Sequence, residues 1–222
     1  MTNDIFDPTL RLAVPTPRLW DIYKAHDHRL TFKWRHYFDI YERYLAPYIN
    51  TPVKLLEIGV LHGGSLQVWK RWLGPQATIV GVDINPNVKF SEEQIHVRIG
   101  NQGDDAFLGG VLSEFGLFDI VIDDGSHIPT EVLSSLRFLY PHMANNGWYF
   151  IEDVDSFYDR PTFFAEVHRL YLELNAYQKD LPTDFTRNTR AIHLHTFMLA
   201  IERGANPRSE VLDAGEGAHA ML

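Results

Sequence analysis

The chain has 222 residues, of which 45% are hydrophobic and 22% are charged, a composition typical of a globular domain. Its formal net charge of −9 disfavours a general nucleic-acid-binding protein, which needs a basic face. The absence of cysteine excludes disulfides, thiolate metal sites and cysteine nucleophiles. No run approaches the roughly 20 apolar residues of a membrane span, and the acidic start lacks a secretory signal pattern. We therefore expect a cytoplasmic protein.

The first segment, residues 1–50, is rich in aromatic side chains. These are Trp20, Tyr23, Phe32, Trp34, Tyr37, Phe38, Tyr41, Tyr44 and Tyr48. One interpretation is one or two helices that pack on a sheet. A second, compatible interpretation is that part of the segment forms a lid or wall over a ligand.

In residues 51–203, apolar runs alternate with helical patterns. Strands are predicted at 54–60, 78–84, 94–100, 118–124 and 148–154. Helices are predicted at 64–74, 104–116, 129–143 and 161–177. This order indicates an α/β protein with a doubly wound, mostly parallel, Rossmann-like sheet. Residues 191–203 predict one long or two short strands at an antiparallel edge, and 204–222 predict a loose tail.

The end of the first predicted strand, "LEIGVLHGGS", suits a cofactor site. Ligands of an open parallel sheet bind at the carboxyl ends of its strands, so Glu57, Gly59, Gly63 and Ser65 are candidate cofactor residues. The second strand ends at Asp83, whose carboxylate can accept hydrogen bonds from both hydroxyls of a ribose.

The spacing of these residues indicates which cofactor binds. A dinucleotide site prefers Gly-x-Gly-x-x-Gly, but the sequence here is Glu-x-Gly-x-x-x-Gly-Gly. Glu57 is a poor neighbour for a pyrophosphate and suits a cationic ligand that carries an ammonium and a sulfonium, which predicts S-adenosylmethionine. The alternative is that the glycines serve only a tight turn. In "GNQGDD", either Gln102 or Asp104 contacts the adenine, or the loop is merely polar.

Two further strands end in acidic residues, in "DIVIDDGSH" and "FIEDVD". Adjacent strand ends lie about 5 Å apart, so these carboxylates would repel one another without a cation. Asp124, Glu152 and Asp153 are the candidate ligands of a hard ion, Mg²⁺ first, with Mn²⁺ or Ca²⁺ as alternatives. The competing interpretation is that these acids cap helices or pair with arginine and lysine.

The same loop contains a candidate catalytic residue. His127 follows Asp124 by three residues, and a histidine whose pKa is near neutral can act as a general base. Asp123 is either structural or a helper on the cofactor side of the site.

Three stretches resemble a known family: "LLEIGVLHGGSLQVWKRWLGPQATIVGVDINP", "IDDGSH" and "NGWYFIEDV". They are similar to the metal-dependent class I methyltransferases that modify sugars on macrolide antibiotics, the mycinamicin-type sugar O-methyltransferases. The rhamnosyl O-methyltransferases and the cephalosporin hydroxylase-like family share the pattern. The resemblance covers roughly residues 20–203. Within it, "RLTFKWRHYFDIYERY" resembles a segment that often reads Thr-Asp-Lys in the family, and Phe32 stands here in place of the acid.

The resemblance implies a class I methyltransferase fold and Mg²⁺ bound by Asp124, Glu152 and Asp153. It also implies that His127 takes the proton from a sugar hydroxyl, and that Glu57 and Asp83 lie beside the methionine and ribose parts of the cofactor.

We therefore expect an S-adenosylmethionine- and Mg²⁺-dependent O-methyltransferase that acts on a deoxysugar or rhamnosyl unit of a natural product or glycolipid. The expected partner is a small-molecule glycoside, with no nucleic acid and no membrane span, and a homo-oligomer is left open. The alternatives are a phenol or catechol acceptor, an NAD-dependent oxidoreductase, and a non-catalytic nucleotide-binding scaffold.

Overall fold

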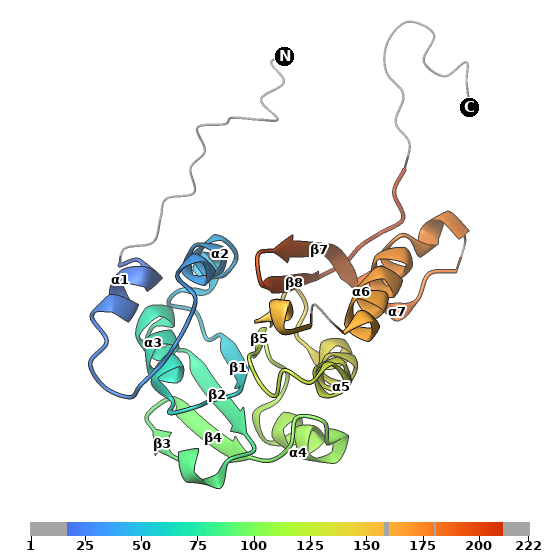
Figure 1. Cartoon of the computed structure of the whole chain (residues 1–222). Coiled ribbons are helices and arrows are strands. Elements are labelled where there is room, and N and C mark those ends of the chain that lie inside the picture. The colour runs from blue at the N-terminus through green and yellow to red at the C-terminus, as the bar shows by residue number, and fades with distance from the viewer. Residues whose placement is uncertain (1–16, 158–159, 180, 211–222) are drawn as a thin grey trace, which may run out of the picture.

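A single mixed sheet organises the computed structural model, which describes residues 17–157, 160–179 and 181–210 (Figure 1). Its eight strands lie in the order β3-β4-β2-β1-β5-β6-β8-β7. They are β1 Lys54–Ile58, β2 Thr78–Asp83, β3 Ser91–Glu92, β4 Ile95–Ile99, β5 Ile120–Asp123, β6 Trp148–Ile151, β7 Thr189–His195 and β8 Met198–Arg203.

The central strands β4, β2, β1, β5 and β6 are parallel. β8 pairs antiparallel with β6, β7 pairs antiparallel with β8, and β3 pairs antiparallel with β4. This arrangement confirms the predicted α/β fold with a mostly parallel sheet and an antiparallel edge. The strand order reverses between β1 and β5, which is where ligands bind in open sheets of this kind.

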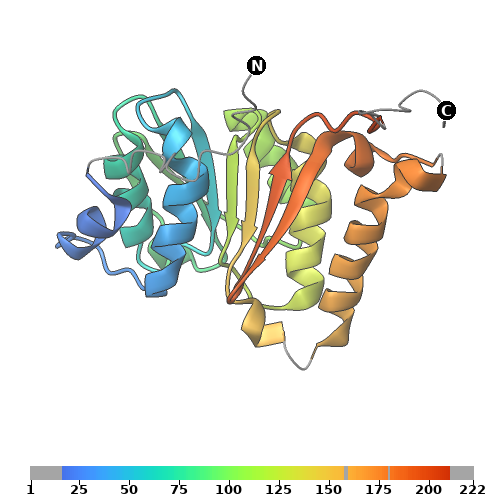
Figure 2. The ribbon, with the colours of Figure 1, turned by 90° about the horizontal axis from the view of Figure 1, so that it is seen from above.

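Helices cover both faces of the sheet (Figures 1 and 2). The helices on one face are α1 Leu19–Lys24, α2 Arg35–Leu45 and α3 Gly64–Leu73, which share one hydrophobic core with the sheet. The helices on the other face are α4 Asp105–Phe115, α5 Pro129–Leu139 and α6 Pro161–Leu174, which share the second core. The short helix α7 is Asp184–Asn188. Within the three described ranges, no helix has the length and apolarity needed to cross a membrane.

The remaining helical segments are single 3₁₀ turns. They are η1 Ala46–Tyr48, η2 Pro86–Val88, η3 Tyr140–His142, η4 Val154–Phe157 and η5 Ala176–Lys179.

The predicted strands and helices are all present, and several end earlier than predicted. The strand predicted at 148–154 ends at Ile151, and the helix predicted at 161–177 ends at Leu174. The helix predicted at 129–143 ends at Leu139 and continues as η3, because Pro141 has no backbone N–H to extend the helical ladder. Of the two alternatives predicted for residues 191–203, the structure has the two short strands, β7 and β8.

The predicted N-terminal helices pack on the sheet, and their buried side chains join the core that contains β1 and β2. Residues 1–16 and 211–222, which include most of the predicted tail, lie outside the described residues. The division of the chain into 1–50, 51–203 and 204–222 therefore stays a prediction.

Gly59 marks a very close approach between the loops that follow β1 and β5. Its φ is +88°, and a Cβ at this position would lie 1.9 Å from the carbonyl oxygen of Asp124. Any other residue would have to adopt a left-handed backbone and also push the two loops apart. The close packing of these loops is what brings the ends of β1 and β5 together.

We predict that Gly59→Ala lowers the free energy of unfolding, measured by urea denaturation. The backbone conformation alone costs about 1–3 kcal/mol, and the overlap with Asp124 adds to that cost. Gly110→Ala is the matched control, because it lies within α4 and a Cβ there meets no heavy atom within 4 Å. The control should raise stability by up to about 1 kcal/mol. Equal stability of the two variants would contradict the packing argument.

Candidate active site

The ends of β1, β5 and β6 bring three acidic side chains to one place. Ladder hydrogen bonds continue past the strands, from Asp124 N to Ile58 O at 2.9 Å and from Glu152 N to Asp123 O at 2.9 Å. Side chains along a strand point alternately to the two faces. The residues two positions before these acids belong to the core under α1, α2 and α3: Leu55, Ile122 and Phe150. Glu57, Asp124 and Glu152 therefore share that face.

A single ammonium lies among these three carboxylates. Lys33 Nζ donates to Asp124 Oδ2 at 2.6 Å and to Glu152 Oε1 at 2.7 Å, and it lies 3.1 Å from Glu57 Oε1. The Lys33 side chain is only 5% exposed. Burial by itself would lower the pKa of Lys33, but the attraction of the three carboxylates outweighs burial and holds the pKa well above its usual value.

One ammonium is too little positive charge for this cluster. Burial, together with the neighbouring charge of Asp124, raises the pKa of Glu152 to about 8. Burial also raises the pKa of Glu57, whose Oε1 accepts no hydrogen bond within the described part of the chain. Burial would also raise the pKa of Asp124, but the positive charge of Lys33 and the hydrogen bond from His127 outweigh burial and lower it. The cluster is therefore suited to more positive charge than one ammonium supplies.

Hydroxyl and indole groups complete the inner side of the cluster. The Tyr41 hydroxyl donates a short hydrogen bond to Glu152 Oε1. Trp69 Nε1 donates to Glu57 Oε2 at 3.2 Å. Because all of these groups are donors, they stabilise Glu57 and Glu152 as anions.

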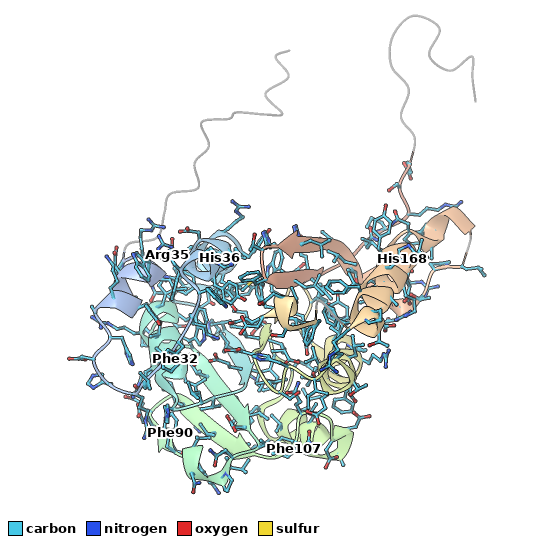
Figure 3. The ribbon with its side chains drawn as sticks, viewed as in Figure 1. Phe32, Arg35, His36, Phe90, Phe107 and His168 are labelled. Carbon is cyan, nitrogen blue, oxygen red and sulfur yellow. The ribbon has the colours of Figure 1, made fainter. Side chains whose placement is uncertain are left out.

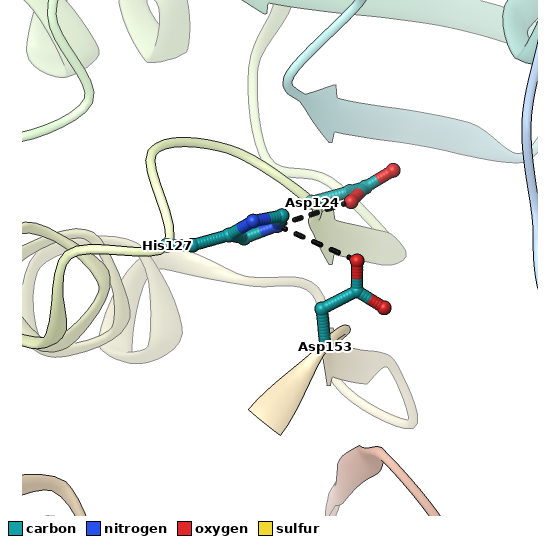
Figure 4. Close-up of side chains that lie close together, drawn as sticks. All are labelled: Asp124, His127 and Asp153. Carbon is teal, nitrogen blue, oxygen red and sulfur yellow. Dashed lines mark hydrogen bonds and ion pairs between the residues drawn. The ribbon is translucent and has the colours of Figure 1, made fainter. Parts of the chain in front are cut away.

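The outer side of the cluster contains His127, Asp124 and Asp153 (Figure 4). His127 Nε2 lies 3.3 Å from Asp124 Oδ1 and 3.8 Å from Asp153 Oδ2. One ligand atom of each residue lies within 4.8 Å of those of the other two, which is compatible with a shared metal ion. The hydrogen bond to Asp124 raises the pKa of His127.

Left-handed backbone conformations at His127 and Asp153 set the directions of these two side chains. The φ values are 51° at His127 and 53° at Asp153, so the chain turns sharply at both residues. The turn at Asp153 brings its carboxylate to the same side as that of Glu152, although neighbours on a regular strand would face opposite ways. Asp153 Oδ1 there accepts hydrogen bonds from Trp34 Nε1 at 3.1 Å and from Tyr37 OH at 2.7 Å.

Asp123 lies on the opposite face of the sheet from Asp124. It accepts hydrogen bonds from Ser135 Oγ at 2.6 Å and from Gln102 Nε2 at 3.1 Å. Burial raises its pKa to about 6. Gln102 also accepts from Ser126 N at 2.7 Å, so its amide joins Asp123 to the loop that carries His127. This geometry favours the structural interpretation of Asp123, and Gln102 shares in the same network.

A pocket of about 640 Å³ joins the acidic cluster to the cofactor side of the sheet. Its lining residues are Tyr23, Phe32, Lys33, Trp34, Gly59, Leu61, Asp83, Asp124, Gly125, His127, Glu152 and Asp153. The structure thus brings the predicted metal, base and ribose residues to a single cavity.

Asp83 lines this pocket, and its carboxylate also accepts hydrogen bonds from neighbouring backbone N–H groups. Its Oδ2 accepts from Val60 N at 2.8 Å and from Leu61 N at 3.2 Å, and its Oδ1 accepts from Asn85 N at 2.8 Å. These bonds hold the loop after β1 against the end of β2. The predicted role in binding ribose hydroxyls would use the remaining lone pairs of the carboxylate.

Other predicted cofactor residues do not line the large pocket. A Cβ at Gly63 would lie 2.3 Å from the Phe90 ring, so this glycine makes room for a protein side chain. Ser65 is buried beside Glu57 and hydrogen-bonds to it. Asp104 caps α4 by accepting from Ala106 N at 2.9 Å. Their roles toward a cofactor stay predictions.

Three residues of the site were missed by sequence reasoning: Lys33, Tyr37 and Tyr41. Each comes from the N-terminal segment and lies more than a hundred residues from Glu152 or Asp153 in sequence. The available signals were the aromatic richness of the segment, its resemblance to a family segment that often reads Thr-Asp-Lys, and a lone lysine between two aromatic residues in "TFKW". Nothing in that spacing identifies which distant carboxylates the lysine meets.

Comparison of sequences places the chain beside sugar methyltransferases. It is 39% identical over 132 residues to the 8-demethyl-8-(2-methoxy-alpha-L-rhamnosyl)-tetracenomycin-C 3'-O-methyltransferase of Streptomyces olivaceus, a match that spans 56% of this chain and 34% of the relative. It is 34% identical over 201 residues to the mycinamicin VI 2''-O-methyltransferase of Micromonospora griseorubida, spanning 79% of this chain and 50% of the relative. The chain thus spans half or less of the length of these relatives. No protein-family model matches it.

Comparison of structures gives the same result. The MycE methyltransferase from the mycinamycin biosynthetic pathway, in complex with Mg, SAH and mycinamycin VI, superposes with a TM-score of 0.72 at 33% identity. The match covers 87% of this chain and 55% of the MycE chain. The class I methyltransferase fold that the sequence predicted is confirmed.

We predict that Ser135→Ala destabilises the protein because it removes the closest hydrogen-bond donor of buried Asp123. The expected loss is about 1–3 kcal/mol in the free energy of unfolding, measured by urea denaturation. Ser113→Ala is the matched control, since the Ser113 hydroxyl bonds only to a backbone carbonyl on the exposed side of α4. The control should change stability by no more than about 0.5 kcal/mol. A Ser135→Ala variant as stable as the control would show that Asp123 needs no anchor.

Proposed function

Because this chain is homologous to the sugar O-methyltransferases of macrolide and tetracenomycin pathways, we propose that it transfers a methyl group from S-adenosylmethionine to a hydroxyl of a sugar. The observation that carries the proposal is the position of His127 between Asp124 and Asp153, in the same pocket as Asp83 and Gly59. The proposed base, the proposed metal ligands and the proposed ribose-binding acid thus line one cavity at the switch point of the sheet.

The residues fit a divalent cation. Glu57, Asp124, Glu152 and Asp153 are carboxylates on one side of the sheet, and Lys33 is the only lysine or arginine paired with them within the described ranges. We propose that Asp124, Glu152 and Asp153 hold Mg²⁺, with Mn²⁺ or Ca²⁺ as substitutes. When bound there, the ion would stabilise the negative charge that develops on the sugar oxygen.

His127 is the proposed general base. The His127 ring lies on the pocket wall beside Asp124, so it can reach a hydroxyl held near Asp124. The hydrogen bond to Asp124 orients the ring and raises its pKa, which makes the neutral imidazole a stronger proton acceptor. As the sugar oxygen attacks the methyl carbon, the bond from that carbon to sulfur breaks and S-adenosylhomocysteine leaves. The hydroxyl proton moves to the nitrogen of the His127 ring that carries no hydrogen.

Aromatic side chains form the outer wall of the pocket, where the acceptor would lie. Phe32 and Trp34 are 66% and 50% exposed, and Tyr23 lines the same pocket. Such rings bind the apolar faces of a sugar and of a hydrophobic aglycone. We propose a deoxysugar or rhamnosyl unit of a natural product or glycolipid, as the relatives' names suggest. The same wall favours a phenol or catechol as the second candidate acceptor.

The position of the cofactor, the cellular location and the oligomeric state are parts of the same proposal. The cofactor would lie along Gly59 and Asp83, with Glu57 behind them. A cytoplasmic location agrees with a chain that contains no cysteine. A homo-oligomeric assembly stays a proposal as well.

We predict that His127→Ala lowers kcat by about 10²–10⁴-fold, because general-base catalysis contributes that much. Binding of S-adenosylhomocysteine, measured by calorimetry, should stay unchanged. His168→Ala is the matched control, since His168 lies on α6, far from Phe32 and the pocket (Figure 3). The control should keep full activity. Full turnover by His127→Ala would exclude this residue as the base.

We also predict that exhaustive chelation abolishes methyl transfer and that added Mg²⁺ restores it. Methyl transfer from radiolabelled S-adenosylmethionine to a panel of glycosides and catechols would measure both the metal requirement and the acceptor class. Unchanged activity of the chelated, metal-free protein would exclude the metal role while leaving the methyltransferase proposal in place.

A further inference from the structure

One short loop binds all three predicted metal ligands. Residues 25–34 connect α1 to α2, and Lys33 in this loop contacts Asp124 and Glu152. The next residue, Trp34, donates from Nε1 to Asp153 Oδ1 at 3.1 Å. The loop therefore already occupies oxygen atoms that a metal ion would need.

We propose that the Lys33 ammonium holds the place of the divalent cation in the metal-free protein, and that the metal must displace it. This inference rests on the proposed metal role of Asp124 and Glu152. Mg²⁺ binds carboxylate oxygens at about 2.0–2.1 Å. Lys33 Nζ lies 2.6 Å and 2.7 Å from the oxygens in question, so an ion that shares both would overlap the ammonium.

Charge explains why the lysine is needed and why it can be replaced. Without a cation, Glu57, Asp124 and Glu152 would repel one another in a buried position. Lys33 supplies one positive charge, which lets these acids pack together before metal arrives. A divalent ion supplies two charges to the same oxygens, so it can replace the lysine and leave the cluster better neutralised.

The displacement would also change the pocket wall. Lys33 lies between Phe32 and Trp34, and all three line the pocket. Earlier in the loop, Leu30 O accepts from Gly64 N at 3.3 Å and Thr31 O accepts from Tyr23 OH at 3.3 Å. The start of the loop is thus tied to the body of the protein, while Lys33 and Trp34 are tied to the acids. Lys33 is therefore a positioning residue that links metal binding to the placement of the aromatic wall.

Binding of Mn²⁺ to the full chain without cofactor tests this inference, with free Mn²⁺ measured by electron paramagnetic resonance. Lys33→Met should bind Mn²⁺ about tenfold or more tightly than the wild type, because the competing charge is gone. Tyr41→Phe is the matched control: it removes another donor to Glu152 without changing the charge, and its affinity should stay much closer to that of the wild type.

The outcomes separate this inference from the proposed function. If the wild type binds Mn²⁺ and Lys33→Met binds no more tightly, the inference is wrong and the metal site stands. If neither protein binds Mn²⁺, the metal role itself is wrong, and the inference fails with it.

A second measurement uses the wild-type protein and does not depend on the folding of a variant. Amine-reactive labelling followed by mass spectrometry should modify Lys33 slowly without metal, because its side chain is 5% exposed. Saturating Mg²⁺ should raise the labelling rate of Lys33 several-fold, with exposed Lys89 as the internal standard. An unchanged or lower rate for Lys33, at a constant rate for Lys89, would overturn the inference.

Discussion

The burial of several carboxylates beside one ammonium is the interaction on which the rest of this site depends. A parallel sheet brings the carboxyl ends of β1, β5 and β6 together, and strand alternation sends Glu57, Asp124 and Glu152 to one face. Without a cation among them, the repulsion of these three carboxylates would lower the stability of the folded protein. Lys33, 91 residues away from Asp124, resolves the repulsion. The N-terminal helices are therefore held to the sheet by charge as well as by the apolar core.

Alternation also explains why two adjacent aspartates serve different purposes. Asp124 faces Lys33 and His127. Asp123 faces the opposite way and accepts hydrogen bonds from Ser135 on α5 and from Gln102 in the loop after β4. The Asp123 network fixes the loop that follows β5, and the loop in turn fixes His127. A hydrogen-bonded network on one face of the sheet thus positions His127 on the other face.

The glycines that follow β1 allow close contacts within the protein, and these contacts explain them more directly than a ligand does. Gly59 allows the loop after β1 to touch the backbone of Asp124, and Gly63 accommodates the ring of Phe90. A glycine-rich turn at this position is therefore required by the close approach of neighbouring loops. Of these two glycines, only Gly59 also lines the large pocket. The cofactor assignment accordingly depends more on Asp83 and on the fold than on the glycine spacing.

The sequence by itself determined the class of fold and the order of the strands along the chain, and it singled out Asp124, His127, Glu152 and Asp153 as candidate site residues. It could do so because apolar periodicity and the position of polar residues at strand ends are local properties. Element ends were less accurate, since caps and prolines act over one or two residues.

Only the tertiary structure decided which groups neutralise the acids. The contacts of Lys33, Tyr37 and Tyr41 join segments that are far apart in sequence, and no local pattern encodes a partner at that distance. The structure likewise separated Asp123 from Asp124, because the face that each occupies depends on where β5 ends and how the next loop turns. Local sequence patterns identified the candidate site residues, and long-range packing determined which charged groups lie beside them.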